Sequence, residues 1–223
     1  MPAEATLNNV PLFSQLTPSD LQRVEELARE RVYPKNSVIL FEDDPGDALY
    51  VVKQGQVKVV LIGEDGREVI LSVLGEGQFF GEMALLDDEP RSAHVIAMED
   101  STLVVLRRED FQGILGQSPA LALALLRELT RRLRRADEKV GSLVLLDVNG
   151  RVARMLLDMA DEEGGDRITR RLTHHTIAQM IGSSRETVSR TMRELSDKGF
   201  IDVTRKDIVL RDRPGLEAAA GRS

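Results

Sequence analysis

The 223-residue sequence predicts an α+β protein with a β-rich first half and a helical second half. Short β-branched runs separated by glycines occupy residues 32–106, a pattern typical of an antiparallel roll or barrel. From Ser118 onward, apolar residues recur at the spacing of helices. The charge divides in the same way, with a net of −11 over residues 1–117 and +4 over residues 170–213. The basic C-terminal region is therefore the part suited to a polyanionic partner.

The amino-acid composition excludes several classes of function. The chain has no Cys, which excludes disulfides, thiolate metal sites and cysteine nucleophiles. It has three His, two of them adjacent, so neither a catalytic triad nor a histidine metal site is expected. No apolar run approaches the roughly 18 residues that span a bilayer, and no basic and apolar leader opens the chain. We expect a cytoplasmic protein that is not an enzyme, binds no metal and has no membrane partner.

The first half contains one helix and a series of strands. The segment LQRVEELA at residues 21–28 is amphipathic, and Thr17 or Ser19 can cap its N-terminus. GEDG at residues 63–66 predicts the turn of a hairpin. The expected strands are SVILF (37–41), ALYVV (48–52), VKVVLI (57–62), REVILSVL (67–74), HVIAM (94–98) and TLVVL (102–106).

A long helix follows, with an apolar stripe at alternating spacings of three and four. The stripe consists of Leu126, Leu129, Leu133, Ala136, Val140 and Leu143. This spacing is that of the a and d positions of a coiled coil, and it predicts a homodimer seam. The alternative is a helix that packs on its own barrel. We favour the dimer because little apolar surface remains beyond the stripe, next to Arg127, Arg131, Arg132, Arg134 and Arg135.

The C-terminal third predicts a helix-turn-helix. A further helix is expected over residues 147–162, and the glycines of DEEGGD end it. Thr173 can cap the helix HHTIAQMI, Gly182 suits a left-handed turn, and Ser183 or Ser184 can cap a second helix that begins RETVSRTM. The closing FIDVTRKDIVL predicts a hairpin with a basic tip, as in a winged variant.

The second of these helices has the side chains that DNA bases require. Its first turn and a half contains Arg185, Glu186, Ser189 and Arg190, where a recognition helix contacts base edges in the major groove. Arg pairs with guanine and Glu accepts from cytosine, so a G·C-rich half-site is expected. Two half-sites about 34 Å apart follow from a two-fold dimer. The residues expected to contact phosphates are Thr173, Ser184, Thr187, Arg205 and Lys206.

The segment GEMALLDDEPRSA at residues 81–93 predicts a pocket for a sugar phosphate with one negative charge. The guanidinium of Arg91 and the hydroxyl of Ser92 match a phosphate, and Gly81 allows backbone N–H groups to approach it. Glu82 would repel a phosphate but can accept from a sugar hydroxyl. The acidic residues 87–89 are interpreted as solvated surface. An ion pair between Glu82 and Arg91 is the alternative for the empty state.

These stretches resemble the cAMP receptor protein / fumarate and nitrate reductase regulator (CRP/FNR) family of bacterial transcription factors. The resemblance extends over nearly the whole chain, with GEMALLDDEPRSA, EKVGSLVLLDVNGRVA and IGSSRETVSRTM in this order. It implies a cyclic-nucleotide-binding β-roll (double-stranded β-helix) over residues 1–117. A dimerisation helix over 118–146 and a winged helix-turn-helix DNA-binding domain over 147–223 would follow. Partners implied are a double-stranded DNA operator similar to TGTGA-N6-TCACA, RNA polymerase and a second copy of the chain.

The resemblance also implies roles for single residues. Glu82 would bind the ribose 2′-hydroxyl. Within one phosphate-binding cassette it would act together with Gly81, Arg91 and Ser92. The base and ribose side of the predicted nucleotide site would consist of Val59, Leu71 and Ser72. The predicted site also includes Met83 from the roll and Arg132 from the long helix. Arg185, Glu186 and Arg190 match the family's three base-contacting residues.

The chain departs from the family at the adenine contact. Where the cAMP receptor protein has a Thr-Ser pair on the dimer helix, this chain has Ala136 and Asp137. A carboxylate only accepts hydrogen bonds, and guanine offers it two parallel donors where adenine offers one donor group. Asp137 is therefore included in the predicted nucleotide site, and it favours cGMP or cyclic di-GMP by about 1–3 kcal/mol. The intact cassette favours cAMP, which we rank first, and a chain that needs no ligand is the third hypothesis.

Two other classes of protein are alternatives to a nucleotide-responsive regulator. A nucleotide-binding subunit of another effector would not need SSRETVSR, and a constitutive DNA-binding regulator would not need the cassette. In the regulator that we favour, the ligand shifts the dimer helices near Ala136 and Asp137 and sets the spacing of both recognition helices. Gly141 and residues 147–150 are the expected hinge.

Overall fold

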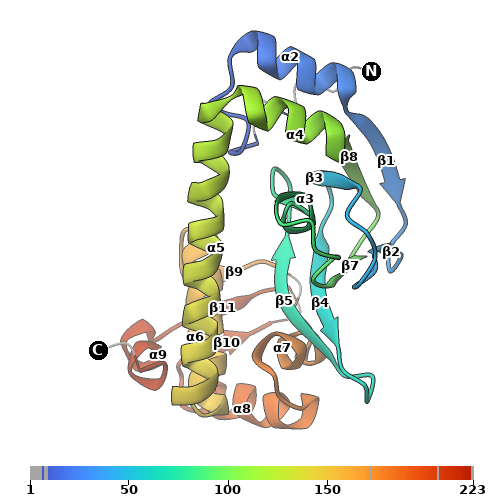
Figure 1. The fold of residues 1–223 in the computed structure, drawn as a ribbon. Helices are drawn as coiled ribbons and strands as arrows, with labels where there is room; N and C mark the ends of the chain where they lie inside the picture. The colour runs from blue at the N-terminus through green and yellow to red at the C-terminus, as the bar shows by residue number, and fades with distance from the viewer. Residues whose placement is uncertain (1–6, 8–9, 171, 205, 222–223) are drawn as a thin grey trace. The chain divides into compact units, whose positions relative to one another are not determined.

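The structure, a computed structural model, describes residues 7, 10–170, 172–204 and 206–221 (Figure 1). Contacts within the chain divide it into two compact units, Met1–Leu133 and Arg134–Ser223. The first unit contains the predicted roll and the second the predicted helix-turn-helix. The α+β class is confirmed.

The first unit begins with a capped helix and continues into strands. The hydroxyl of Thr17 accepts from Asp20 N at the start of α2, as predicted. The elements are α2 (Pro18–Leu27), β1 (Arg29–Tyr33), β2 (Val38–Leu40), β3 (Ala48–Gln54), β4 (Val57–Ile62), β5 (Glu68–Leu74), β6 (Phe79–Phe80), α3 (Met83–Leu86), β7 (His94–Ala97), β8 (Ser101–Arg107), α4 (Arg108–Gln117) and α5 (Pro119–Leu145). The six strands expected from the sequence are present.

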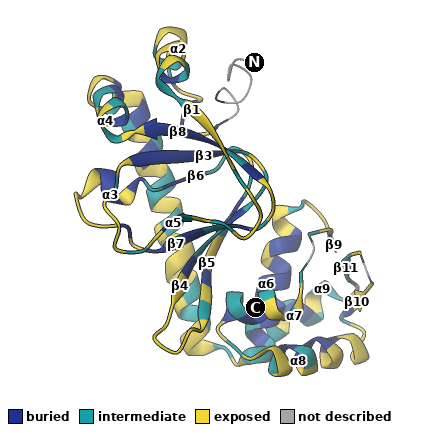
Figure 2. Ribbon diagram, turned by 90° about the vertical axis from the view of Figure 1, so that its right-hand side faces the viewer, coloured by how far each residue is buried: buried dark blue, intermediate teal, exposed yellow. Residues whose placement is uncertain are grey.

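Two antiparallel four-stranded sheets form the roll. Their orders are β1-β8-β3-β6 and β2-β7-β4-β5. Strand β3 is buried on both faces (Figure 2), because Leu49 and Val51 point to a different core from that reached by Ala48, Tyr50 and Val52. The first core also contains residues of α2, α4 and α5, and the second lies between the sheets. The hairpin at GEDG joins β4 and β5 as predicted, with Gly63 N–H donating to Arg67 O.

The predicted apolar stripe of α5 is largely exposed within one chain. Exposed fractions are 60% for Leu126, 62% for Leu133 and 60% for Val140, whereas Leu129 is half-buried against the core of the first unit. Helix α5 is instead anchored in that core by Leu121 and Leu125. A row of exposed leucine and valine side chains leaves surface that a second copy can cover.

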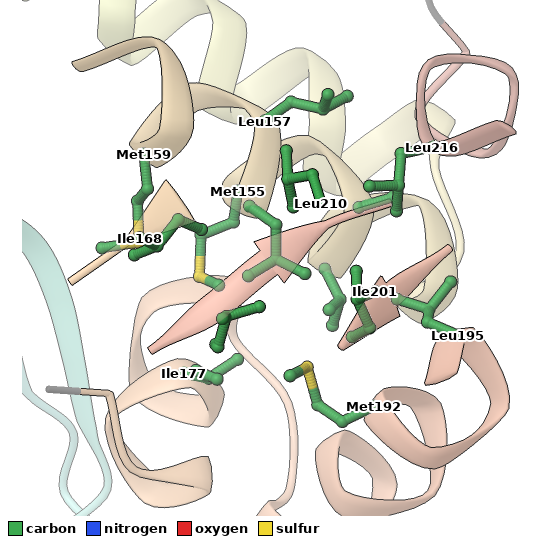
Figure 3. Packing of buried hydrophobic residues seen from close by; sticks show 14 of the residues in the cluster. Met155, Leu157, Met159, Ile168, Ile177, Met192, Leu195, Ile201, Leu210 and Leu216 are labelled. Atoms are coloured by element: carbon green, nitrogen blue, oxygen red, sulfur yellow. The ribbon is translucent and has the colours of Figure 1, made fainter. Parts of the chain in front are cut away.

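The second unit has its own core, composed of residues from the helices and strands that follow α5 (Figure 3). The side chains of Met155 and Leu157 from α6 and Ile177 from α7 are buried there, together with Met192 and Leu195 from α8. The elements after α5 are α6 (Val148–Glu162), β9 (Arg167–Ile168), α7 (His174–Ile181), α8 (Arg185–Asp197), β10 (Ile201–Val203), β11 (Ile208–Leu210) and α9 (Arg213–Ala219).

The helix-turn-helix has the caps that the sequence predicts. Thr173 caps α7, Gly182 adopts the left-handed conformation with φ of 66°, and Ser184 rather than Ser183 caps α8. The predicted wing hairpin is β10 and β11, to which β9 adds a third strand. The helix α9, which the sequence did not suggest, packs Leu216 into the core.

The break between α5 and α6 is shorter than the segment expected as the hinge, which was Gly141 and residues 147–150. Gly141 lies inside α5, and the break between the helices falls at residues 146–147. The carboxylate of Asp147 accepts from Gly150 N at 2.8 Å and caps α6. Gly150 leaves no room for a Cβ, which would lie 2.9 Å from the carbonyl oxygen of Ala219.

Candidate nucleotide-binding and DNA-binding sites

Arg91 is a buried cation at the predicted cassette. Its side chain is 3% exposed. Nη1 donates to the carbonyl of Gly81 at 2.6 Å, and Nη2 donates to the carbonyl of Ala48 at 2.9 Å and to Asp47 Oδ1 at 3.0 Å. The carboxylate of Asp47 is 76% exposed, so it can leave Arg91 for water at little desolvation cost.

One donor of Arg91 remains without an acceptor. Nε is buried and has no hydrogen-bond partner among the described residues. A buried donor of this kind is uncommon, and an oxygen of a ligand or of solvent could serve as its acceptor. The residues present therefore fit an anion with several acceptor oxygens, as a phosphodiester has.

Gly81 is required by the same guanidinium. It follows β6 with φ of +84°, in the left-handed region that favours glycine. A Cβ at this position would lie 2.6 Å from Nη1 of Arg91 and 3.1 Å from the carbonyl oxygen of Ala48. The glycine thus lets the backbone approach the cation closely.

Glu82 is the second buried charge of the site. Only 3% of the residue is exposed, and Oε1 accepts from Arg132 Nη1 at 3.0 Å. Arg132 also donates to the carbonyl of Phe79 at 2.5 Å and lies 4.4 Å from the centre of its ring. The carboxylate can accept further hydrogen bonds, since it has about four lone-pair sites. The alternative pairing of Glu82 with Arg91 is not the one observed, because Arg91 pairs with Asp47.

Two aromatic rings support Arg91 without adding charge. Tyr50 is stacked on Phe80 with ring centroids 5.2 Å apart, and Cζ of Arg91 lies 5.9 Å from the centre of the Tyr50 ring. Burial raises the pKa of the Tyr50 phenol to about 12, with a further contribution from Asp47. The phenol is therefore neutral near pH 7 and leaves the charge of Arg91 to its carboxylate partner or to a ligand.

The other predicted contacts within the roll are more exposed. Ser92 is exposed, and its hydroxyl lies 3.7 Å from the sulfur of Met83, which is 49% exposed. Val59 on β4 pairs with Ser72 on β5, and Leu71 is the bulge residue beside this pair, 42% exposed. These side chains offer hydroxyl groups and apolar atoms.

Ala136 and Asp137 lie on α5, in the second unit. Both residues are exposed. Asp137 has no hydrogen-bonded or charged partner among the described residues. A free carboxylate at this point is available to a ligand or to a second subunit.

The start of α8 presents charged side chains to solvent. Arg185, Glu186 and Arg190 are exposed, and none has a hydrogen-bonded or charged partner among the residues described. Ser189 and Thr187 are half-buried on the same helix. Unpaired cations at a helix N-terminus suit DNA better than they suit a structural role.

Two of the predicted phosphate contacts are helix caps, and a third lies in the wing. Ser184 and Thr173 are exposed caps whose hydroxyl oxygens accept from Thr187 N and Thr176 N. Lys206 is exposed beside the wing turn. Arg205, the other basic residue of the wing tip, lies outside the described residues.

Some functional neighbours had no signal in the sequence. Asp47 pairs with Arg91 from a position 44 residues earlier, and only the pairing of strands brings them together. Thr191, which is buried on α8, donates to Asn149 Oδ1 of α6 at 2.8 Å. A threonine inside an otherwise amphipathic helix is the one pattern that could have indicated this second contact.

Metal and membrane chemistry add no further site to the described residues. No group of three or more His, Asp or Glu side chains there is placed to bind a metal ion. No helix in the same part of the chain combines the length and apolar character needed to span a bilayer.

Comparisons with known proteins agree with both halves of the structure. Residues 30–118 match the cyclic nucleotide-binding domain family, and residues 150–219 match the Crp-like helix-turn-helix domain family. A CRP-like cAMP-activated global transcriptional regulator from Mycobacterium tuberculosis is 32% identical over 214 residues, or 94% of this chain and 96% of the relative. The cyclic AMP receptor protein of Thermus thermophilus is 36% identical over 210 residues, with the same coverage.

A solved structure is similar over both units. The c-di-GMP responsive global regulator CLP of Xanthomonas campestris has a TM-score of 0.75 and 26% identity. The match covers 87% of this chain and 99% of that one.

Proposed function

Because the chain belongs to the CRP/FNR family of cyclic-nucleotide-binding, DNA-binding transcription regulators, we propose that it is a homodimer gated by cAMP. The observation that carries this proposal is the buried Arg91, whose Nε has no acceptor among the described residues and whose carboxylate partner is exposed. A cyclic phosphate would take the place of Asp47 and supply the missing acceptor. Two curated relatives of high coverage are described by their names as cAMP-activated or cAMP receptors.

Glu82 would bind the ribose of the proposed ligand. A buried carboxylate that retains acceptor capacity suits the 2′-hydroxyl, which donates. Arg132 fixes the carboxylate from α5, so the ligand would contact a group tied to the long helix. Gly81, Met83 and Ser92 complete the phosphate side of the proposed site. Val59, Leu71 and Ser72 would line the base and ribose.

A guanine ligand is the second candidate, and Asp137 favours it. The carboxylate is exposed and unpaired among the described residues, and its acceptor pair matches guanine N1–H and N2–H₂. A structural relative is named as c-di-GMP responsive. Calorimetric titration of the purified protein with cAMP, cGMP and cyclic di-GMP distinguishes the candidates. The cAMP assignment predicts the lowest Kd for cAMP. Tightest binding of a guanine nucleotide, lost in Asp137→Ala, would contradict it.

For the DNA site we propose a palindromic operator similar to TGTGA-N6-TCACA. Arg185, Glu186 and Arg190 would contact base edges, with Ser189 beside them. Contacts to phosphates would come from Thr173, Ser184, Thr187, Arg205 and Lys206. RNA polymerase is the expected protein partner, and the cytoplasm is the compartment in which these partners are found.

Gating would be transmitted by α5. We propose a roll over residues 1–117, a dimerisation helix over 118–146 and a DNA-binding domain over 147–223. The junction at Asp147 would be the hinge. Leu143 of α5 lies beside the helix-turn-helix turn, since a Cβ added at Gly182 would lie 3.6 Å from Cδ2 of Leu143. A change in α5 can therefore alter the position of that turn.

A further inference from the structure

The first unit contains a cavity that shares only Arg132 with the proposed nucleotide site. Its volume is about 180 Å³, and it lies between residues 11–15, the loop at 77–79 and one face of α5. The side chains from α5 are Ala124, Arg127, Glu128, Arg131 and Arg132. These α5 positions, other than Ala124, are polar and charged, which distinguishes the cavity from a gap in the core.

The cavity is cationic. Three arginines line it and Glu128 is the one acidic residue in the described lining. Glu128 accepts from Arg131 Nη1 at 2.9 Å and from Arg132 Nε at 3.3 Å, so its negative charge is already paired with two arginines. Arg127 has no hydrogen-bonded or charged partner among the described residues. The wall therefore has a net positive charge and uncommitted guanidinium donors.

The spacing of two arginines favours an anion between them. Arg127 and Arg131 are four residues apart on α5, and like charges at this spacing face each other and destabilise a helix. Arg131 is 58% exposed and pairs with Glu128. A carboxylate between the two guanidiniums would replace this repulsion with charge-assisted hydrogen bonds.

The remaining lining indicates the rest of the ligand. Gln78 accepts from Gly75 N with Oε1 at 2.8 Å, and its Nε2 has no hydrogen-bond acceptor in the described part of the chain. Leu12 and Phe79 provide apolar atoms on the wall. This combination suits a small organic acid with an apolar body better than it suits inorganic phosphate.

We propose that this cavity binds a small organic carboxylate between Arg127 and Arg131. The cavity adjoins the cassette through Arg132, which lines the cavity and pairs with Glu82, but neither Glu82 nor Arg91 lines it. The inference goes beyond the proposed function and does not depend on nucleotide binding.

The test uses the full-length protein with benzoate as the probe and benzamide as its uncharged control. Saturation-transfer NMR measures the Kd of each compound for the wild type, Arg127→Gln, Arg131→Gln and Arg134→Gln. The last variant removes an exposed arginine of the same helix that does not line the cavity. We expect saturable binding of benzoate, a Kd at least about tenfold higher in the first two variants, and no change in Arg134→Gln.

The site would be overturned by equal binding of benzamide, by an equal benzoate Kd in Arg127→Gln and wild type, or by no saturable benzoate binding. Displacement of benzoate by cAMP would also overturn it, by placing benzoate in the cassette. If the protein bound no nucleotide, the proposed function would fail while the arginine variants still decided the carboxylate site.

Discussion

Gly81 is the residue on which the cassette geometry depends most directly. Its φ of +84° and the 2.6 Å that would separate an added Cβ from Arg91 Nη1 are two separate constraints. We expect Gly81→Ala to lower the free energy of unfolding by more than about 1 kcal/mol and to raise the Kd for cAMP, because strain and displacement of Arg91 combine. Urea denaturation and calorimetry measure the two effects.

Gly66 provides the matched control for this substitution. It has φ of +76°, but a Cβ there would meet nothing within 4 Å. Gly66→Ala should therefore cost about 1 kcal/mol from backbone strain alone and leave the Kd for cAMP unchanged. Equal nucleotide affinity in both variants would show that close approach of Gly81 to Arg91 is unimportant.

At the scale of single residues, the sequence identified two charged side chains of the cassette, and their role in binding stays a prediction. A guanidinium beside a glycine and a glutamate suggested an anion and a sugar hydroxyl, and the structure buries both Arg91 and Glu82. The counter-ions Asp47 and Arg132 come from distant parts of the chain. Sequence chemistry alone could not select the counter-ion of Arg91, because several carboxylates precede β3.

Among the elements, α6 and α8 share a polar contact in an otherwise apolar interface. Thr191, 2% exposed, donates to Asn149, whose Nδ2 lies 3.4 Å from Glu194 Oε2. We expect Thr191→Val to lower the free energy of unfolding by about 1–2 kcal/mol, because the amide oxygen loses its donor inside the unit. It should also weaken operator binding, since the same contact orients α8. Denaturation and fluorescence anisotropy are the measurements.

The control for this contact is an exposed threonine on another helix. Thr130→Val removes a hydroxyl that bonds only to Leu126 O of its own helix. It should leave the free energy of unfolding within about 0.5 kcal/mol of wild type. If Thr191→Val behaved in the same way, the contact would have no part in positioning the recognition helix.

The recognition helix and the wing should respond differently to loss of a cation. Arg185→Ala should relax specificity at one G·C pair of each half-site and cost about 1–3 kcal/mol of binding free energy. Lys206→Ala should weaken all sequences alike and reduce the dependence of binding on salt. Anisotropy titrations against an operator series at several salt concentrations distinguish them. Identical specificity profiles for wild type and Arg185→Ala would contradict the assignment of base contact to Arg185.

Elements were predictable where their apolar pattern was regular. Six strands of the roll were identified, but the exposed, charged β1 and the two-residue β6 were not. Helix α9 was missed because RPGLEAA contains Pro and Gly and has one buried leucine, Leu216. Its stability comes from packing on α6 and from Arg213, which pairs with Asp161 and Asp166.

At the scale of the whole molecule, the exposed stripe on α5 is the expected dimer contact. Leu133→Asp places a charge at an a position that is 62% exposed in one chain, and it should convert the dimer to monomers. Sedimentation velocity measures the change. Arg134→Asp, at the neighbouring outward position, is the control and should remain dimeric. A wild-type monomer, or a dimer in Leu133→Asp, would exclude this seam.

The order of the two units and their separate chemistries followed from the sequence, because charge and periodicity change together near Ser118. The boundary between compact units falls later, after Leu133, since the first turns of α5 are anchored by Leu121 and Leu125. Periodicity identifies a helix but not the core in which each of its turns is buried.

The central claim is that a ligand on Arg91 changes the affinity of the DNA-binding unit for its operator. The most direct measurement is the operator Kd of the full-length protein, by fluorescence anisotropy, with and without saturating cAMP, for wild type and Arg91→Ala. The account predicts that cAMP lowers the Kd of the wild type by about 5- to 150-fold and leaves that of Arg91→Ala unchanged. The same operator Kd with and without cAMP in the wild type, or an equal cAMP response in Arg91→Ala, would contradict it.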